Sequence, residues 1–285
     1  MGSDICIAVS PYDNKPSLKN HAILVGIDAY PDEPLKSCVR DVEKIKECLE
    51  EKVVSINIQT LTAHSLESKT IDESQRPTYR GVASALENTT LQASRGDFVY
   101  IHYSGHGTRL PPCFDFSNRS TGDLALVLLE GGQSKEIYLR GPRLAGYLRA
   151  MVEKGLIVTL VLDCCFSATV YRNSDTEVRY LPSDPTAAPT YQMDLDTGIP
   201  DTSFRSENRD ASMRDNWLLD PDQYVILAAC GPNENAKVTM DSEGDTGIST
   251  NVCVPDFDNR VWSSILSCTE IQTKVFLVLL TRAGM

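Results

Sequence analysis

Apolar runs of strand length alternate with segments of helical periodicity, and this alternation restricts the fold more than any other feature. The clearest run, Gly155 to Asp163 (GLIVTLVLD), is apolar almost throughout, as expected for a strand buried on both faces. Five more strands are expected: His21 to Asp28, Val54 to Leu61, Asp97 to Ser104, Leu124 to Leu129 and Tyr224 to Cys230. Helices are expected over Cys38 to Glu50, Thr78 to Ala93 and Pro142 to Lys154. This order predicts an α/β fold with a mostly parallel sheet flanked by helices on both faces.

The charge of the chain argues against several classes of partner. Its 27 Lys and Arg against 39 Asp and Glu leave a net charge of −12. Nucleic acids and anionic membrane surfaces require clustered positive charge, so neither is an expected partner. No apolar stretch reaches the roughly 18 residues of a membrane span, and the first residues lack a secretory signal pattern. The nine cysteines contain no C-x-x-C pair, which argues against a zinc or thioredoxin motif, and a reducing cytoplasmic location is expected.

Two strong strands end in residues that are suited to nucleophilic catalysis. In Phe98 to Gly107 (FVYIHYSGHG), His106 lies between two glycines just past the strand. In Leu160 to Ala168 (LVLDCCFSA), Cys164 and Cys165 follow the other strand. The carboxyl ends of parallel strands meet at one edge of a sheet, so an imidazole and a thiol can face each other there. Neighbouring residues at a strand end point in opposite directions, so only one of the two cysteines is expected in the cleft.

The other three histidines have structural interpretations. His21 opens a strand, His64 lies in a polar turn, and His102 lies inside a strand where it alternates with Tyr100. We therefore expect His21 and His102 in the core and His64 in solvent.

The two motifs together resemble the caspase-like clan of cysteine peptidases, and within it the metacaspases. That family has a His within Y-S-G-H-G and a Cys within D-x-C-x-S-G, which HYSGHG and DCCFSA match here. Leu35 to Asp41 (LKSCVRD) and Gln223 to Ala236 (QYVILAACGPNENA) are similar to further family blocks. The resemblance covers residues 18–240 and implies one caspase-like peptidase domain, in which residues 167–222 form a long polar loop. Residues 241–285 do not resemble the closing helix and strand of the family, so an atypical C-terminal tail is expected.

The resemblance also implies roles for individual residues. Cys165 would be the nucleophile, His106 the general base and acid, and the N–H groups of Gly107 and Cys165 would hold the oxyanion. Metacaspases cleave after Arg or Lys. The first-subsite residues of the family correspond to four positions: Cys38, Asp41, Ser104 and Asp163. Two carboxylates in one pocket suit a guanidinium or an ammonium, so proteins or peptides with a basic residue before the scissile bond are the expected partners.

Several positions depart from the family pattern. Phe166 and Ala168 stand where the family has His and Gly, so the turn after the nucleophile is expected to differ. Many metacaspases need calcium, but the segment after the His motif offers only Asp115 and Asp123, and Arg172 stands where another acid would be sought. A hard cation requires several carboxylate oxygens. We therefore assign no metal ligand, and the calcium site implied by the family looks degraded.

Three interpretations of function remain open. The leading one is a cysteine endopeptidase that uses a Cys–His dyad and cleaves itself after a basic residue of the long loop. The second is a caspase-like module without activity, which serves in signalling or as a scaffold; the altered turn and the tail favour it, and the retained His106 and Cys165 oppose it. The third is an unrelated α/β thiol enzyme. No G-x-S-x-G elbow or glycine-rich phosphate loop favours other hydrolases or nucleotide-binding proteins.

Overall fold

A five-stranded parallel sheet organises the chain. In this computed structural model the described residues are 18–64, 73–110, 123–130, 136–164, 181, 224–228, 249–250 and 266–267. The strand order in the sheet is β2–β1–β3–β7–β8, and every pairing is parallel. The strands are β1 (Asn20–Ile27), β2 (Ile56–Ala63), β3 (Phe98–Ser104), β7 (Ile157–Asp163) and β8 (Val225–Ala228). The mostly parallel sheet predicted from the apolar runs is therefore confirmed.

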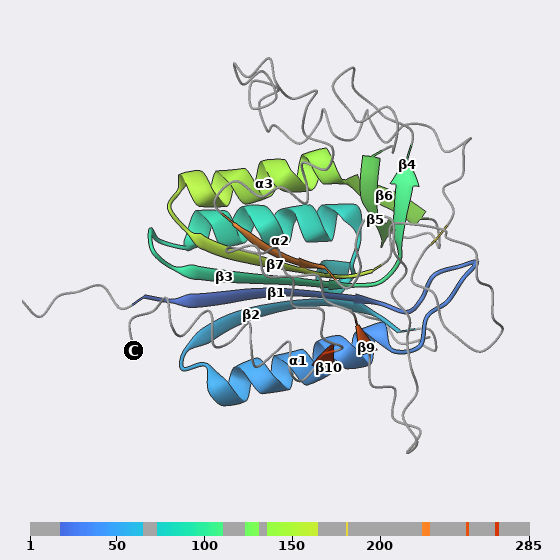
Figure 1. Cartoon of the computed structure of the whole chain (residues 1–285), viewed down its shortest axis with the longest axis horizontal. Coiled ribbons are helices and arrows are strands. Elements are labelled where there is room, and N and C mark those ends of the chain that lie inside the picture. The colour runs from blue at the N-terminus through green and yellow to red at the C-terminus, as the bar shows by residue number, and fades with distance from the viewer. Residues whose placement is uncertain are drawn as a thin grey trace, which may run out of the picture.

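Helices cover both faces of this sheet (Figure 1). The helix α1 (Cys38–Lys52) lies on one face, and α2 (Tyr79–Gln92) and α3 (Gly141–Glu153) lie on the other. Alternate strand residues divide between the two layers: Leu24 and Val161 join a core cluster with residues of α1, and Val25 and Leu162 join the larger cluster on the opposite face. The alternation explains why each of these strands is almost wholly apolar.

A smaller antiparallel sheet follows β3 directly. Its order is β4–β5–β6, with β4 (Gly107–Leu110), β5 (Asp123–Leu129) and β6 (Glu136–Arg140). The sequence predicted β5 but not β4 or β6, which are short and carry charged residues. A 3₁₀ turn, η1 (Glu73–Gln75), precedes α2. The small sheet lies at the end of the molecule where β3 ends and α3 begins (Figure 1).

Three helix boundaries follow from local chemistry. The hydroxyl of Thr78 accepts a hydrogen bond from Gly81 N (3.0 Å) and so caps α2 at the predicted start. In α3, Pro142 lies in the first turn, where its missing N–H removes no helical bond. Gly155 adopts a positive φ of 86° soon after α3 ends, a conformation that favours glycine.

Several predictions fall on residues outside the described ranges. Within the predicted loop 167–222 the structure describes only Leu181, whose amide donates to Gly107 O (3.1 Å) and whose side chain is buried. Within the predicted tail it describes β9 (Ser249–Thr250) and β10 (Leu266–Ser267), a short antiparallel pair. The boundaries of the predicted domain and tail thus stay predictions. Among the described helices, none is both long and apolar enough to cross a bilayer.

Candidate active site

Three strands end in register at the carboxyl edge of the sheet. Gly26 of β1 pairs with Ser104 of β3, and Ser104 pairs with Asp163 of β7. Because side chains alternate along each strand, Ser104 and Asp163 project to the α1 face, two residues beyond His102 and Val161. The Ser104 hydroxyl donates to Asp163 Oδ2 (3.2 Å), and both residues are buried. Two of the predicted subsite residues are therefore in direct contact.

The first turn of α1 packs against this row of strand ends. A Cβ atom on Gly26 would lie 3.0 Å from Cys38 O and 3.1 Å from the Cα of Val39, so a larger residue would push the helix away. Cys38 and Asp41, the other two predicted subsite residues, belong to this turn and are buried. The structure therefore brings the turn that carries them to the same edge as Ser104.

Asp28 holds the first turn of α1 in place, and sequence reasoning missed it. Its Oδ1 accepts from Cys38 N (2.9 Å) and its Oδ2 accepts from Val39 N (3.4 Å). The carboxylate supplies the acceptor that the N-cap residue Ser37 does not, since Ser37 makes no side-chain capping bond in this described helix. The sequence signal is weak because Asp28 lies ten residues before the amide that it caps.

The ring of His106 is held in one orientation just beyond β3. Its Nε2 lies 2.7 Å from the main-chain oxygen of Glu33, and its ring packs against that of Tyr30 with centroids 4.5 Å apart. A carbonyl oxygen can only accept, so Nε2 carries the proton, and Nδ1 is the basic nitrogen of the neutral ring. Only 1% of the residue is exposed. Glu33 has no sequence signature because a main-chain carbonyl is common to every residue.

Two buried tyrosines hold the main chain of His106. The His106 N–H donates to Tyr30 Oη (2.9 Å), and the His106 carbonyl accepts from Tyr103 Oη (2.6 Å) and Val127 N (3.0 Å). The two hydroxyls lie 3.1 Å apart. Burial raises the pKa of both Tyr30 and Tyr103 well above the ordinary value, so both remain neutral donors. We call Tyr30 and Tyr103 the tyrosine pair. A Cβ on Gly105 would lie 2.5 Å from the Tyr30 hydroxyl, so the pair also requires glycine there.

The remaining histidines occupy the positions expected of structural residues. His21 Nε2 lies 3.5 Å from Asp97 Oδ2, and both residues are buried. His102 is buried with its Nδ1 3.4 Å from Tyr100 Oη. His64 is half-buried. His106 is therefore the histidine that this structure places at the ends of β3 and β7.

Of the two cysteines after β7, the structure describes only Cys164. Cys164 is 1% exposed and belongs to the core cluster on the α2 and α3 face, opposite to Asp163. A thiol in that position cannot reach a substrate, so Cys164 is a core residue. Cys165, the predicted nucleophile, lies outside the described residues together with Phe166 and Ala168. Its role stays a prediction.

The main chain of Gly107 lies outside the hydrogen bonds that join β4 to β5. Gly107 faces Leu126 across the β4–β5 ladder, and the neighbouring bond joins Val127 N to His106 O (3.0 Å). In an antiparallel ladder this pattern makes Gly107 and Leu126 a non-hydrogen-bonded pair. The ladder therefore does not use the N–H of Gly107.

Asp123, one of the two acids considered for calcium, contacts a buried arginine. Asp123 Oδ2 lies 3.1 Å from Arg140 Nη1, and both residues are buried, so this carboxylate is engaged in an ion pair. The other two positions considered, Asp115 and Arg172, lie outside the described residues. Across the described ranges, no group of three or more His, Cys, Asp or Glu residues could hold a metal ion.

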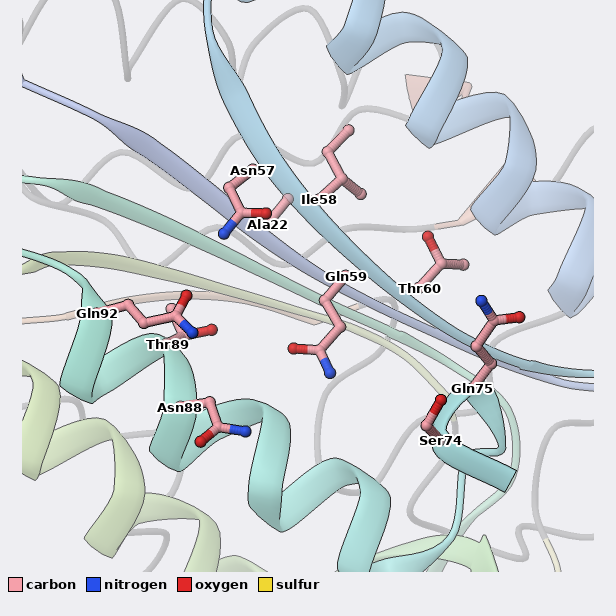
Figure 2. Close-up of a pocket in the computed structure, with 10 residues that line it drawn as sticks. All are labelled: Ala22, Asn57, Ile58, Gln59, Thr60, Ser74, Gln75, Asn88, Thr89 and Gln92. Atoms are coloured by element: carbon pink, nitrogen blue, oxygen red, sulfur yellow. The ribbon is translucent and has the colours of Figure 1, made fainter. Parts of the chain in front are cut away.

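A groove of about 430 Å³ lies at the opposite side of the sheet, between β2 and α2. Figure 2 shows amide side chains pointing into it, among them Asn57 and Gln59 of β2 and Asn88 of α2. The described residues that line it carry no thiol, imidazole or carboxylate. Strands β1 and β3 separate β2 from β7. The groove is thus distinct from the edge that carries His106.

A parallel sheet whose carboxyl edge carries a held histidine after one strand and Asp-Cys-Cys after the next defines the class of caspase-like peptidase domains. Within that class, the chain belongs to the metacaspase family: the metacaspase peptidase C14 domain matches residues 20–173, just over half of the chain.

Similar proteins come from plants and bacteria. Metacaspase-8 of Arabidopsis thaliana is 30% identical over 154 residues, which cover 51% of this chain and 36% of that protein. Metacaspase-6 of the same plant is 36% identical over 149 residues, which cover 51% and 37%. The chain thus matches little more than a third of the length of these relatives. Among solved structures, protein GSU0716 of Geobacter sulfurreducens matches 76% of this chain and 75% of its own, with 22% identity and a TM-score of 0.48.

Proposed function

We propose that this protein is a cysteine endopeptidase that cleaves peptide bonds after Arg or Lys, with Cys165 as nucleophile and His106 as general base and acid. The observation that carries the proposal is the tautomer of His106, which a hydrogen bond to the main chain of Glu33 fixes. Because Nε2 donates to Glu33 O at 2.7 Å, Nδ1 is the nitrogen that can take a proton from a thiol. The register of Ser104 with Asp163 supports the pairing, since Cys165 follows Asp163 by two residues.

The proposed reaction has two stages. In the first, Cys165 Sγ gives its proton to His106 Nδ1 and attacks the carbonyl carbon; the C–N bond then breaks as His106 returns that proton to the leaving amine. In the second, His106 takes a proton from water and the resulting hydroxide attacks the carbonyl carbon of the thioester. The C–S bond then breaks, the carboxylic acid product leaves, and His106 returns the proton to Cys165 Sγ. The Glu33 carbonyl stabilises the imidazolium formed in each stage because it accepts the Nε2 proton throughout.

The tetrahedral intermediate of each stage carries a negative oxygen. The N–H groups of Gly107 and Cys165 are the proposed donors to it. Support comes from the β4–β5 ladder, which does not use the Gly107 N–H. The tyrosine pair holds the preceding peptide of His106, so this donor is fixed before substrate binds.

The proposed preference for Arg or Lys rests on the acids at the carboxyl edge. Asp163 lies beside Ser104 there, and Asp41 lies in the turn of α1 that packs on Gly26. Buried carboxylates attract a guanidinium or ammonium, and they repel an acidic side chain. Cys38 completes the proposed subsite from the same turn.

The test is hydrolysis of fluorogenic peptides ending in Arg, Lys or Asp. The variants are C165A and, as the matched control, C164A, which removes the adjacent thiol from the core. We expect Arg and Lys peptides to be cleaved, with kcat/KM falling by at least about 10³-fold in C165A. We expect C164A to keep cleaving these peptides, although with lower thermal stability. An equal loss of kcat/KM in C165A and C164A would refute Cys165 as the nucleophile. Cleavage of the Asp peptide would refute the assignment of the acidic subsite.

The same assay addresses two further points. We propose that the reaction does not require calcium, because Asp123 is engaged by Arg140, so rates with calcium and with a chelator should agree. Folded protein that cleaves no peptide would favour the inactive signalling or scaffold module. We also propose a reducing compartment such as the cytoplasm, in which a thiol nucleophile stays reduced.

A further inference from the structure

Within the described residues, a buried arginine in the first turn of α3 has no counter-ion. Arg143 is 5% exposed, and its Nε and Nη2 have no hydrogen-bond partner in the part of the chain that the structure describes. Arg140, three residues earlier, shows the usual arrangement: it is equally buried, and its guanidinium contacts the carboxylate of Asp123 at 3.1 Å. Among the described residues, Arg140 thus has an anionic partner and Arg143 has none.

The contact that the structure gives Arg143 is aromatic. Its Cζ lies 5.2 Å from the centre of the Tyr147 ring, one helical turn further along α3. A cation–π contact offsets only part of the free energy required to remove a guanidinium from water. A charge that is buried in this way therefore requires an anion.

The two nitrogens without partners indicate the shape of that anion. Nε–H and Nη2–H lie on the same edge of the planar guanidinium and point in parallel. Two such donors match two oxygens of one carboxylate or phosphate group. The free edge of Arg143 therefore selects a bidentate oxyanion rather than a halide.

The surrounding helix end favours the same ligand. No acidic residue lies in the first turn of α3, and the N-cap Arg140 makes no side-chain capping bond, although this helix is described throughout. The N-terminus of a helix carries a partial positive charge, which the charge of Arg143 increases. The side chain of a residue in the first turn leans toward that end. An oxyanion there would neutralise both charges.

We propose that the first turn of α3 is an oxyanion-binding site, in which Nε and Nη2 of Arg143 bind a carboxylate or a phosphate group. Neither His106 nor the acids of the carboxyl edge take part, so the site does not depend on the proposed peptidase activity.

The test is thermal unfolding of the full chain in rising inorganic phosphate or acetate, with chloride holding ionic strength constant. At an anion concentration of about ten times Kd, we expect the midpoint to rise by about 3 °C or more and then to follow the saturation curve of one site. Saturation by phosphate at lower concentration than acetate indicates a phosphate ligand, and the reverse indicates a carboxylate.

Variants on one helix assign the effect. R143M keeps a long apolar side chain and should lose the anion effect, and in chloride alone it should be at least as stable as the wild type. R149M removes an exposed arginine of α3 and should keep the effect. R143K keeps the positive charge but loses the two parallel N–H donors of the guanidinium, so we expect it to bind the anion about tenfold more weakly. This variant also tests the proposal if R143M does not fold. No saturable shift in the wild type, or the same shift in R143M and R149M, would overturn the proposal.

Discussion

Replacing Tyr30 by phenylalanine removes one hydroxyl from the group that holds His106. That hydroxyl accepts from His106 N (2.9 Å) and donates to Val127 O (3.0 Å). The single proton of Tyr103 Oη is shared between His106 O (2.6 Å) and Val127 O (2.8 Å), so the substitution leaves the His106 N–H without its acceptor and weakens the bonding of Val127 O. Such a loss costs about 2 kcal/mol, which for a chain of this size lowers the unfolding midpoint by roughly 4–8 °C.

The same substitution should affect catalysis if the proposed function is correct. The His106 peptide positions both the ring and the Gly107 amide, and a shift of about 1 Å in reacting groups reduces rates by about 10²-fold. We therefore expect kcat for an Arg peptide to fall by about 10–100-fold in Y30F, with a smaller change in KM. Stopped assays at saturating peptide and calorimetry on the same preparations give the two readouts.

The matched control is Y100F, which removes a buried hydroxyl from β3, the strand that precedes His106. The Tyr100 hydroxyl lies 3.4 Å from His102 Nδ1, and its side chain belongs to the core cluster on the α1 face. We expect a midpoint loss below that of Y30F and an unchanged kcat. The reasoning fails if Y30F unfolds and turns over as the wild type does, or if Y100F loses as much kcat.

Three further predictions concern residues around the site. G105A should lower stability by about 1–3 kcal/mol in denaturant titrations, because its Cβ would lie 2.5 Å from Tyr30 Oη; unchanged unfolding would show that the tyrosine pair yields easily. D28A should cost about 2 kcal/mol by the same measurement, whereas D28N, which keeps one acceptor, should cost less; equal losses would argue against capping. Burial and the nearby Asp32 raise the pKa of Glu136 to about 7, so the folded state retains the proton and stability falls as pH rises from about 4.5 to 7. E136Q should therefore melt above the wild type at pH 8 and with it at pH 5; the same gap at both values would contradict this sign.

The long apolar runs predicted the main sheet closely. His21 to Asp28 was expected as a strand, and β1 is Asn20–Ile27; Gly155 to Asp163 was expected, and β7 is Ile157–Asp163. Such runs are informative because a central parallel strand is buried on both faces whatever surrounds it. The small sheet was harder to predict. Arg140 ends β6 as a buried cation, and its carboxylate partner Asp123 is 17 residues away in sequence.

The candidate site likewise contains residues that the sequence predicted and contacts that it did not. His106 was singled out because it lies between glycines after a strong strand, and Ser104 and Asp163 were expected to meet through the resemblance to metacaspases. The atoms that hold His106 were not expected. Glu33 O is 73 residues away in sequence and Tyr30 Oη is 76, and neither a main-chain carbonyl nor a tyrosine in a loop has a local pattern that marks it.

The sequence by itself determined which segments form buried strands, that most of these strands are parallel, and which reactive residues follow them. It could do so because burial and periodicity are properties of neighbouring residues. Tertiary structure alone decided which ring nitrogen of His106 carries the proton and that Cys164 faces the core. It also decided that Arg140 is paired with a carboxylate and that Arg143 has none among the described residues. These facts depend on contacts between segments that are distant in sequence. A hydrogen bond or an ion pair acts over a few ångströms, so it is specified only when the fold has brought both partners together.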